Sequence, residues 1–340
     1  MINFNDIGSW HFVSELDELV VTTSGDSLSV SIYSSDNTLL LATTYVPVDG
    51  EVRIYHLHRL LSPLISGVVS KFNITVGGMQ SKWVNVVQSR VAVGEPASLF
   101  LQEFFLSAVM SERDTAVGRK ELLTVLPIEA TVPDVVAEAS YWDGTKVVTS
   151  SRTLAQGLSS GDAAEIDVSA SRLVDDTLGR LVAYTIVCGK RVMRYRVTSL
   201  PTAHYALLMR NNFGAWEPLY FQGMTESAPE YSRETAMVNG RLMLYNLEET
   251  DTLKCWTGPM RPAGVSLARD LARSREVVML EDGEGTEAVV ITAVEVKHSD
   301  EDNAIADMTF TWRRASMLSS RLMPIHIPKL FDKTFDETFN

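Results

Sequence analysis

The chain has only two cysteines among its 340 residues, Cys188 and Cys255, and it has no CxxC pair. Two thiols so far apart in sequence do not predict a structural disulfide, and without a CxxC pair a zinc knuckle is excluded. No apolar run is long enough to span a membrane. The N-terminus lacks the basic region and the apolar run of a signal peptide. We therefore expect neither membrane insertion nor a secretion signal.

Strong catalytic signatures are also missing. The sequence has no HExxH motif and no GxGxxG motif in a βαβ context. The glycine-rich segment 157–162 lacks the Lys-Ser/Thr ending of a phosphate-binding loop, so it is interpreted as a turn. A net charge of −13 argues against binding to the phosphate backbone of nucleic acids. We expect a protein that is not an enzyme and has no cofactor.

The sequence does contain many short strand patterns. Hydrophobic residues are 45% and charged residues 21%, as in globular proteins, and the length suggests two or three domains. Leu28–Tyr33 alternates apolar and polar residues, and the turn clusters 34–37 and 47–50 follow it. Strands separated by turns every eight to twelve residues predict a β-sandwich domain over residues 1–95.

Within this domain His56 and His58 form an HxH pair, whose rings would share one face of a strand. No third ligand with convincing spacing lies nearby in the sequence. The pair is therefore interpreted as surface or edge histidines, and no metal site is predicted.

A second domain, residues 96–200, repeats the first in outline. Three blocks match in order at offsets of 108 to 113 residues: residues 29–47 with 137–155, 50–62 with 163–175, and 72–78 with 184–190. The repeat predicts two tandem immunoglobulin-like β-sandwich domains, with the second a possible duplicate of the first. Between its strands, residues 99–106 are expected to form an apolar strand and residues 107–120 an exposed excursion.

Residues 201–320 predict a β-rich α+β domain with one short helix. Tyr205–Phe221 is an apolar run broken by Asn-Asn-Phe-Gly, which predicts a strand, a tight turn and a second strand. Residues 265–275 place Leu267 and Leu271 on one helical face. The acidic segment 298–303 lacks the pattern of a calcium-binding loop and is interpreted as a solvated turn.

Several segments of this last domain resemble a known class of proteins. They are FGAWEPLYFQG, an NGR segment, a W-T-G strand, a short helix leading into SREVVML, and a closing DMTFTWR. Together with the chain's last residues, LFDKTFDETFN, they resemble the C-terminal region of tail or baseplate proteins in virions of Bacteroidetes phages and prophages. The resemblance covers about the last 140 residues, and it implies a virion structural role without catalytic residues.

The end of the chain, residues 321–340, is predicted to be a docking arm. It repeats F-D-x-T, and Phe331, Phe335 and Phe339 share one face in either a helix or a strand. Three exposed phenylalanines would be a liability, so we expect the arm to dock on its own chain or on a neighbour. Further interaction candidates are the aromatic residues at predicted turns and strands: Trp142, Phe213 and Trp216.

Together these patterns predict a structural protein that acts through subunit interfaces, with partners that are copies of itself or other tail subunits. Its expected location is the virion, or the bacterial cytoplasm during assembly. The alternative is a carbohydrate-binding β-sandwich protein, in which exposed aromatic side chains would stack on a glycan. The candidates for that stacking are Trp142, Trp216, Tyr220 and Trp256.

Overall fold

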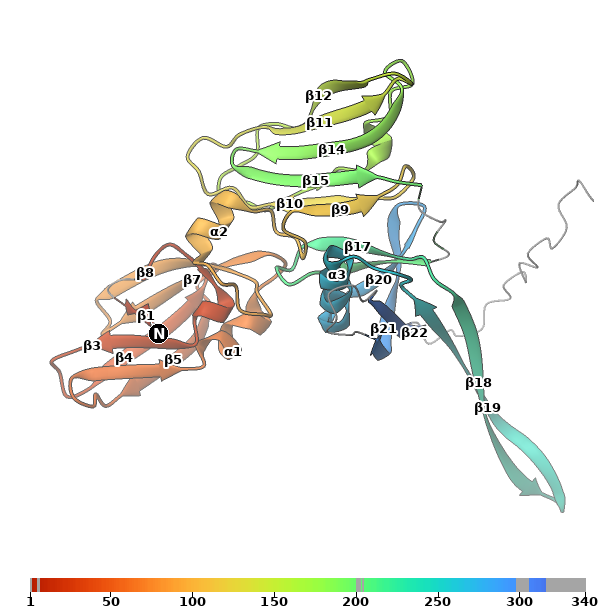
Figure 1. The fold of residues 1–340 in the computed structure, drawn as a ribbon. Coiled ribbons are helices and arrows are strands. Elements are labelled where there is room, and N and C mark those ends of the chain that lie inside the picture. Colours follow the sequence, from red (N-terminus) through yellow and green to blue (C-terminus); the bar gives the residue numbers. More distant parts are fainter. Residues whose placement is uncertain (1, 5–6, 200–202, 204, 298–305, 316–340) are drawn as a thin grey trace, which may run out of the picture.

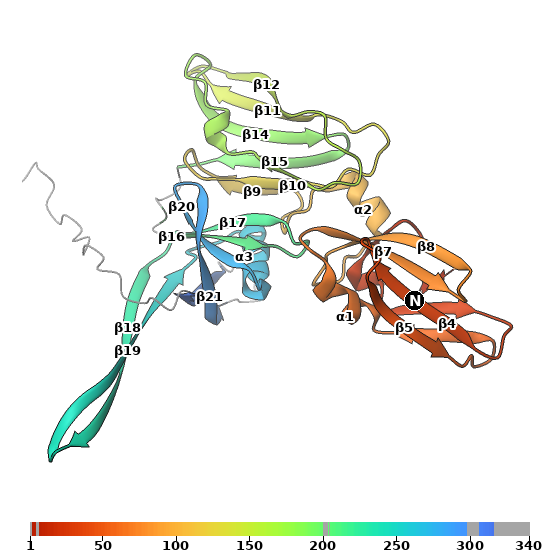
Figure 2. The ribbon, with the colours of Figure 1, turned by 180° about the vertical axis from the view of Figure 1, so that it is seen from behind.

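The computed structural model describes residues 2–4, 7–199, 203, 205–297 and 306–315. Strands form 54% of the chain and helices 11%, so the prediction of a mainly β protein is confirmed. Figures 1 and 2 show three groups of strands. We call them the first unit (residues 2–95, which include the segment that follows its last strand), the second unit (residues 112–197) and the C-terminal unit (residues 205–315).

The first unit is a β-sandwich. Its elements are β1 (Ile2–Asn3), β2 (Trp10–Phe12), η2 (Val13–Glu15), β3 (Glu18–Thr22), β4 (Leu28–Ser34), β5 (Leu39–Tyr45), β6 (Glu51–Tyr55), α1 (Leu57–Leu61), η3 (Ser62–Leu64), β7 (Val69–Val76) and β8 (Gln80–Val87). One sheet has the order β2-β8-β7-β4-β5 and the other β1-β3-β6. The predicted alternation in β4 buries Leu28, Val30 and Ile32 in the core that the two sheets share.

The second unit repeats this strand order. Its elements are β9 (Glu112–Thr115), β10 (Leu122–Val125), β11 (Val135–Trp142), β12 (Val147–Ala155), β13 (Ala164–Asp167), η4 (Ala170–Arg172), β14 (Arg180–Cys188) and β15 (Arg191–Val197). The strand order β9-β15-β14-β11-β12 matches the order β2-β8-β7-β4-β5 of the first unit, and the pair β10-β13 corresponds to the pair β3-β6. In both units the first pair of the large sheet is parallel. The three matching sequence blocks fall on equivalent strands; the duplication and the exact domain boundaries stay predictions.

Two predictions for residues 97–120, at the junction of the first and second units, were wrong. Residues 97–103 form the helix α2 (Ala97–Glu103) rather than a strand, because Ala97, Phe100 and Leu101 together bury one helical face. A short apolar run does not distinguish the two structures. Residues 107–120 are not an exposed excursion either. They contain β9, in which Arg113 and Thr115 are buried because their polar atoms find buried partners.

The C-terminal unit is one seven-stranded sheet with a helix packed on it. Its elements are β16 (Tyr205–Arg210), β17 (Trp216–Phe221), β18 (Thr225–Val238), β19 (Arg241–Trp256), α3 (Pro262–Arg273), β20 (Val277–Glu281), β21 (Glu284–Lys297) and β22 (Asp307–Arg314). The sheet order is β17-β16-β20-β21-β22-β19-β18. Leu267 and Leu271 of α3 are buried, as their spacing predicts. The strand–turn–strand prediction for Tyr205–Phe221 is confirmed by β16 and β17.

Candidate functional site: an arm and the joint that carries it

The hairpin of β18 and β19 projects from the C-terminal unit as an arm (Figures 1 and 2). Its strands pair from Thr225 with Cys255 out to Val238 with Arg241. The turn is Asn239-Gly240, both with positive φ, which matches the twist that two-residue hairpins require. Among the described residues, β19 meets its other neighbour, β22, only from Leu253 to Trp256. The rest of the arm is therefore a two-stranded ribbon with both edges open.

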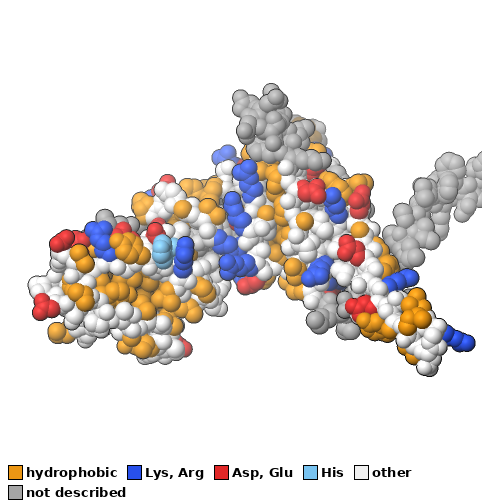
Figure 3. Space-filling view, turned by 90° about the horizontal axis from the view of Figure 1, so that it is seen from below, with side chains coloured by type: hydrophobic (Ala, Val, Ile, Leu, Met, Phe, Trp, Pro, Cys, Tyr) orange, Lys and Arg blue, Asp and Glu red, His pale blue; other side chains and the backbone are white. Residues whose placement is uncertain are grey.

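The outer part of this arm is apolar and exposed. Met237 and Leu242 face each other across the two strands, and each is 68% exposed. The other large apolar residues exposed toward the tip are Val238, Met243, Leu244, Tyr245 and Leu247. In the view from below, hydrophobic side chains gather at the end of the arm (Figure 3). Apolar residues thus stand on both faces of the ribbon, and among the described residues nothing covers them.

Two physical properties of this arm are those of a docking element. An isolated two-stranded hairpin is only marginally stable in water, because it buries little of its surface. Open strand edges also carry unpaired N–H and C=O groups that another strand can bind. Soluble monomers usually avoid such a combination of open edges and contiguous apolar surface. The arm therefore has the chemistry of a surface that is completed by a partner.

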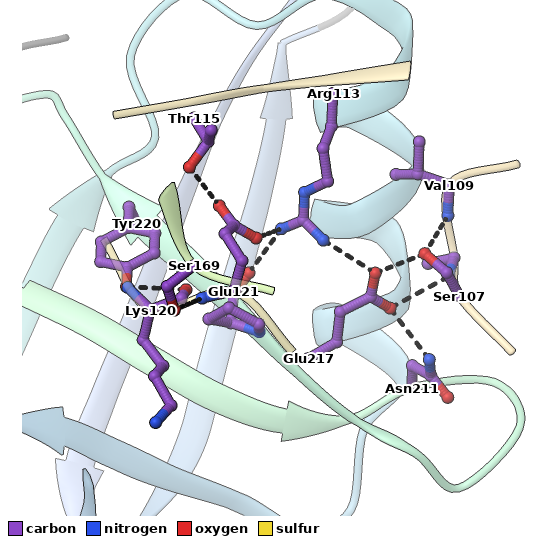
Figure 4. A network of polar contacts seen from close by, with 12 residues as sticks. Ser107, Val109, Arg113, Thr115, Lys120, Glu121, Ser169, Asn211, Glu217 and Tyr220 are labelled. Carbon is purple, nitrogen blue, oxygen red and sulfur yellow. Dashed lines mark hydrogen bonds and ion pairs between the residues drawn. The ribbon is translucent and has the colours of Figure 1, made fainter. Parts of the chain in front are cut away.

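A buried polar network joins the second unit to β17, the strand that precedes the arm in the chain (Figure 4). The guanidinium of Arg113, on β9, lies 3.2 Å from Glu121 and 3.0 Å from Glu217 of β17. Glu217 also accepts hydrogen bonds from Ser107 Oγ at 2.6 Å and from Asn211 Nδ2 at 2.9 Å. Both carboxylates are only 1% exposed, so the network fixes two units together and offers no access to a substrate.

Burial and charge act in opposite directions within this network. Burial raises the pKa of Glu121, and the nearby guanidinium of Arg113 only partly offsets that effect. Burial lowers the pKa of Arg113, but the charges of Glu121 and Glu217 outweigh it, so the pKa of Arg113 is raised overall. Arg113 therefore stays charged, and it is the group that makes two buried carboxylates tolerable.

The turn between β16 and β17 joins the first unit to the same place. Asn212 Oδ1 accepts hydrogen bonds from the backbone N–H groups of Arg90 and Val91, both at 2.8 Å. The N–H of Asn212 donates to Asp270 of α3 at 2.5 Å. Burial raises the pKa of Asp270, and that hydrogen bond opposes the shift. One four-residue turn thus contacts both the first unit and the helix of the C-terminal unit.

Phe213, at the centre of that turn, is an internal contact rather than a surface one. It is 2% exposed, and its ring lies 5.7 Å from Phe12 and 5.2 Å from Phe100 between ring centroids. Such aromatic packing stabilises the meeting of the first unit, α2 and the C-terminal unit. Its predicted role as a contact for another molecule is not compatible with this burial. The sequence could not separate the two roles, because a turn position predicts exposure.

The four aromatic candidates for glycan binding are divided among three strands. Trp216 and Tyr220 are on β17, Trp256 ends β19, and Trp142 ends β11 in the second unit. Cationic side chains lie over three of these rings: Arg210 over Trp216 at 4.1 Å, Arg119 over Tyr220 at 4.7 Å, and Lys254 over Trp256 at 5.2 Å. A sugar stacking on those faces would have to displace a cation–π contact. Trp142, 41% exposed, remains as a surface candidate.

The remaining predicted features divide between the described and undescribed parts of the chain. Phe331, Phe335 and Phe339, and the acidic segment 298–303, lie outside the described residues. Cys188 and Cys255 are buried and free. Among the described residues, no helix is both long and apolar enough to cross a membrane.

The segment GLSSG, residues 157–161, lies within the predicted turn and also fits the letters of the GxSxG nucleophile motif. That motif needs a sharp strand-to-helix turn. Here the segment is an exposed loop between β12 and β13, with Ser159 in solvent. Its geometry therefore does not present a nucleophile elbow.

Comparison with known proteins gives no family. No family model matches the chain, and no curated protein matches it. Among solved structures, it is similar to a chain in the virion of a native gene transfer agent particle, with 15% identity and a TM-score of 0.23 over 32% of this chain and 91% of that one. A chain from the tail of an empty gene transfer agent particle gives 10% identity and a TM-score of 0.23 over 33% and 91%. A chicken TCR gives 9% and 0.16 over 61% and 88%.

Proposed function

We propose that the chain is a non-enzymatic structural subunit of a phage or prophage tail, and that the arm of β18 and β19 is its main assembly contact. The arm's apolar tip carries this proposal, because its exposed residues and open edges have no covering partner in the part of the chain that the structure describes. The resemblance of the C-terminal segments to tail and baseplate proteins supports the virion context. The partner in this proposal is a second copy of the chain or another tail subunit.

The mechanism is burial of surface, and the rest of the fold suits it. The polar network of Arg113 and the turn at Asn212 hold both sandwich units against the sheet from which the arm extends. A rigid base reduces the conformational entropy that is lost when the arm docks. The sandwiches then present their own loops and edges to further neighbours.

The test is the mass of the purified full chain in light scattering over a range of concentrations. We expect multimers, and we expect the double substitution Met237→Glu/Leu242→Lys to reduce them. These two residues are directly opposite, so the new charges pair across the strands and the hairpin itself is preserved. The matched control is Val46→Glu/Val48→Lys, which changes two equally exposed apolar residues of the first unit.

Two results would contradict the proposal. A wild-type chain that stays monomeric at every concentration, and that is missing from particles released by the induced host, would remove the assembly role. Equal multimer formation by the arm variant and by the wild type would leave assembly possible but would exclude the arm as its contact. Detection of the chain in purified particles by mass spectrometry tests the tail context separately.

A further inference from the structure

A second feature of the first unit, independent of the arm, brings three metal-binding side chains together. Asp17 precedes β3, His56 directly follows β6, and His58 lies in the first turn of α1. Because β3 and β6 pair with Glu18 opposite Tyr55, the residues just beyond that pair become neighbours. The backbone N–H of His56 donates to the carbonyl of Asp17 at 2.6 Å, which fixes the junction. The fold therefore supplies the third ligand that the HxH pair lacked in the sequence.

The distances from the Asp17 carboxylate to the two imidazole nitrogens fit one bound ion. Nδ1 of His56 lies 3.2 Å from Asp17 Oδ1, and Nδ1 of His58 lies 3.1 Å from the same oxygen. All three donor atoms lie within 4.8 Å of one another. Metal–ligand bonds of about 2.0–2.2 Å at tetrahedral or octahedral angles separate neighbouring ligand atoms by about 3.0–3.5 Å. The two measured nitrogen–oxygen distances fall in that interval.

Hydrogen bonding alone does not account for this arrangement. Nδ1 of His56 makes a hydrogen bond with Asp17. Nδ1 of His58 is shielded from solvent and has no hydrogen-bond partner, although it lies as close to the same carboxylate. A protonated His58 ring would pair with Asp17 through this nitrogen, whereas in a neutral ring with its proton on Nε2 a bound cation would satisfy it.

The backbone at His56 is the second unusual observation. Its φ is +59°, in the left-handed region that non-glycine residues rarely adopt. This conformation lets the chain turn sharply from β6 into α1, so that the rings of His56 and His58 lie 5.9 Å apart, edge to face. Strained conformations of this kind persist where the surroundings impose them, and they are concentrated at functional sites.

We propose that Asp17, His56 and His58 bind one divalent transition-metal ion, with zinc as the best match. Two imidazoles and one carboxylate suit zinc and its first-row neighbours, whereas magnesium and calcium prefer oxygen ligands. The side chains of His56 and Asp17 are 58% and 62% exposed, which leaves the outer coordination position open to water or to another molecule.

The surroundings indicate what would take that open position. Asp17 and His58 also line a cleft of about 800 Å³ between the first unit and the C-terminal unit, and arginines stand on its wall: Arg90, Arg210, Arg273 and Arg275. In Figure 3, histidine side chains lie beside a group of Lys and Arg side chains on the same face. Such a wall favours an anionic fourth ligand, such as a carboxylate from a neighbouring subunit.

The experiment titrates Zn²⁺ into the untagged, chelator-treated full chain by calorimetry, with the melting temperature as a second readout. We expect binding of one ion per chain and a rise in melting temperature, because the folded state alone assembles the three ligands. Affinity should fall in acid, since imidazole binds metal only in its neutral form. Cobalt substitution should give the visible absorption of a nitrogen- and oxygen-ligated tetrahedral or five-coordinate ion.

Three single variants identify the ligands: His56→Asn, His58→Gln and Asp17→Asn. Asparagine tolerates the left-handed conformation, so His56→Asn removes the ligand without adding backbone strain. Each variant should weaken binding by at least about tenfold, by analogy with losses seen for metal-supporting residues. The control Asp26→Asn, an exposed aspartate of the same unit, should bind as the wild type does. No binding by the wild type, or binding that all three variants retain, would overturn the proposal.

Discussion

Arg113 and Glu217 form an ion pair at 3.0 Å across the boundary between the second unit and the C-terminal sheet. The two residues are 104 positions apart in sequence, and both are buried. Neither charge could be buried alone without a large cost, so each is tolerable only when the two units are docked. The pair thus makes the docked arrangement of these units specific.

Replacing Glu217 by glutamine should destabilise the chain by about 3–5 kcal/mol, the usual cost of breaking a buried ion pair. The substitution keeps the shape of the side chain but leaves Arg113 with one carboxylate instead of two. Denaturant-induced unfolding measures the loss. Arg53→Gln, which removes a solvent-exposed ion pair with Glu18 and Glu51, is the control and should leave the midpoint unchanged. Equal midpoints for the two variants would contradict this account of the network.

The pH dependence of stability should contain a contribution from Glu121. Burial raises its pKa above the ordinary value of 4.5, so in this pH range the folded state binds more protons than the unfolded state. Its contribution to stability is therefore present below about pH 4.5 and is lost as the pH rises through the raised pKa. Glu121→Gln should make the free energy of unfolding less dependent on pH above that point. Parallel pH profiles for the variant and the wild type would show that Glu121 is not the group responsible.

Substitution of Gly214 by alanine should cost more stability than its positive φ alone would cause. Its φ is +75°, and a Cβ there would overlap the carbonyl oxygen of Gly67 in the first unit. Gly78 has a φ of +72° with nothing within 4 Å, so it isolates the backbone effect. We expect Gly78→Ala to cost about 1 kcal/mol and Gly214→Ala about 2–5 kcal/mol, since overlap adds to the strain. Thermal unfolding compares them, and similar losses would mean that the close approach is unimportant.

Deletion of residues 330–340 tests the predicted docking of the chain's last segment, residues 321–340, which is distinct from the β18–β19 arm. Three phenylalanines on one face should gain stability from docking, so the shortened chain should show a smaller assembly or a lower melting temperature. The control replaces Asp332 and Asp336 by asparagine, which keeps the phenylalanines. An unchanged particle mass and an unchanged melting temperature in the deletion variant would count against docking.

The fold could be predicted where local pattern and burial agree. The alternation in β4 and the Asn-Asn-Phe-Gly break in Tyr205–Phe221 are short-range signals, and both produced the expected strands. The immunoglobulin-like assignment of the sandwiches stays a prediction. The segment containing α2 was predicted wrongly as a strand. Over so short a length, its apolar residues are compatible with both the helical period of 3.6 residues and the strand period of two.

The functional features depend on pairings that no local pattern contains. From the sequence, Arg113 was interpreted as part of a charged, exposed loop. Its partners Glu121 and Glu217 come close to it only when the sheets form. Asp17 joins His56 and His58 for the same reason, through the register of β3 with β6. The long hairpin of β18 and β19 was not predicted from the sequence, because residues 222–235 were interpreted as a polar link. That most of the arm has no further neighbouring strand among the described residues follows only from the sheet order and the strand pairing.

The position of the turn at Asn212 has a mechanical consequence. It touches the first unit and α3, while Glu217 on the strand after it holds the second unit, and the arm begins a few residues after that strand ends. Tension applied at the arm's tip would pass along the backbone directly into this three-way meeting point. Both sandwich units would then bear the load at the same time, rather than detaching from the C-terminal unit one after the other.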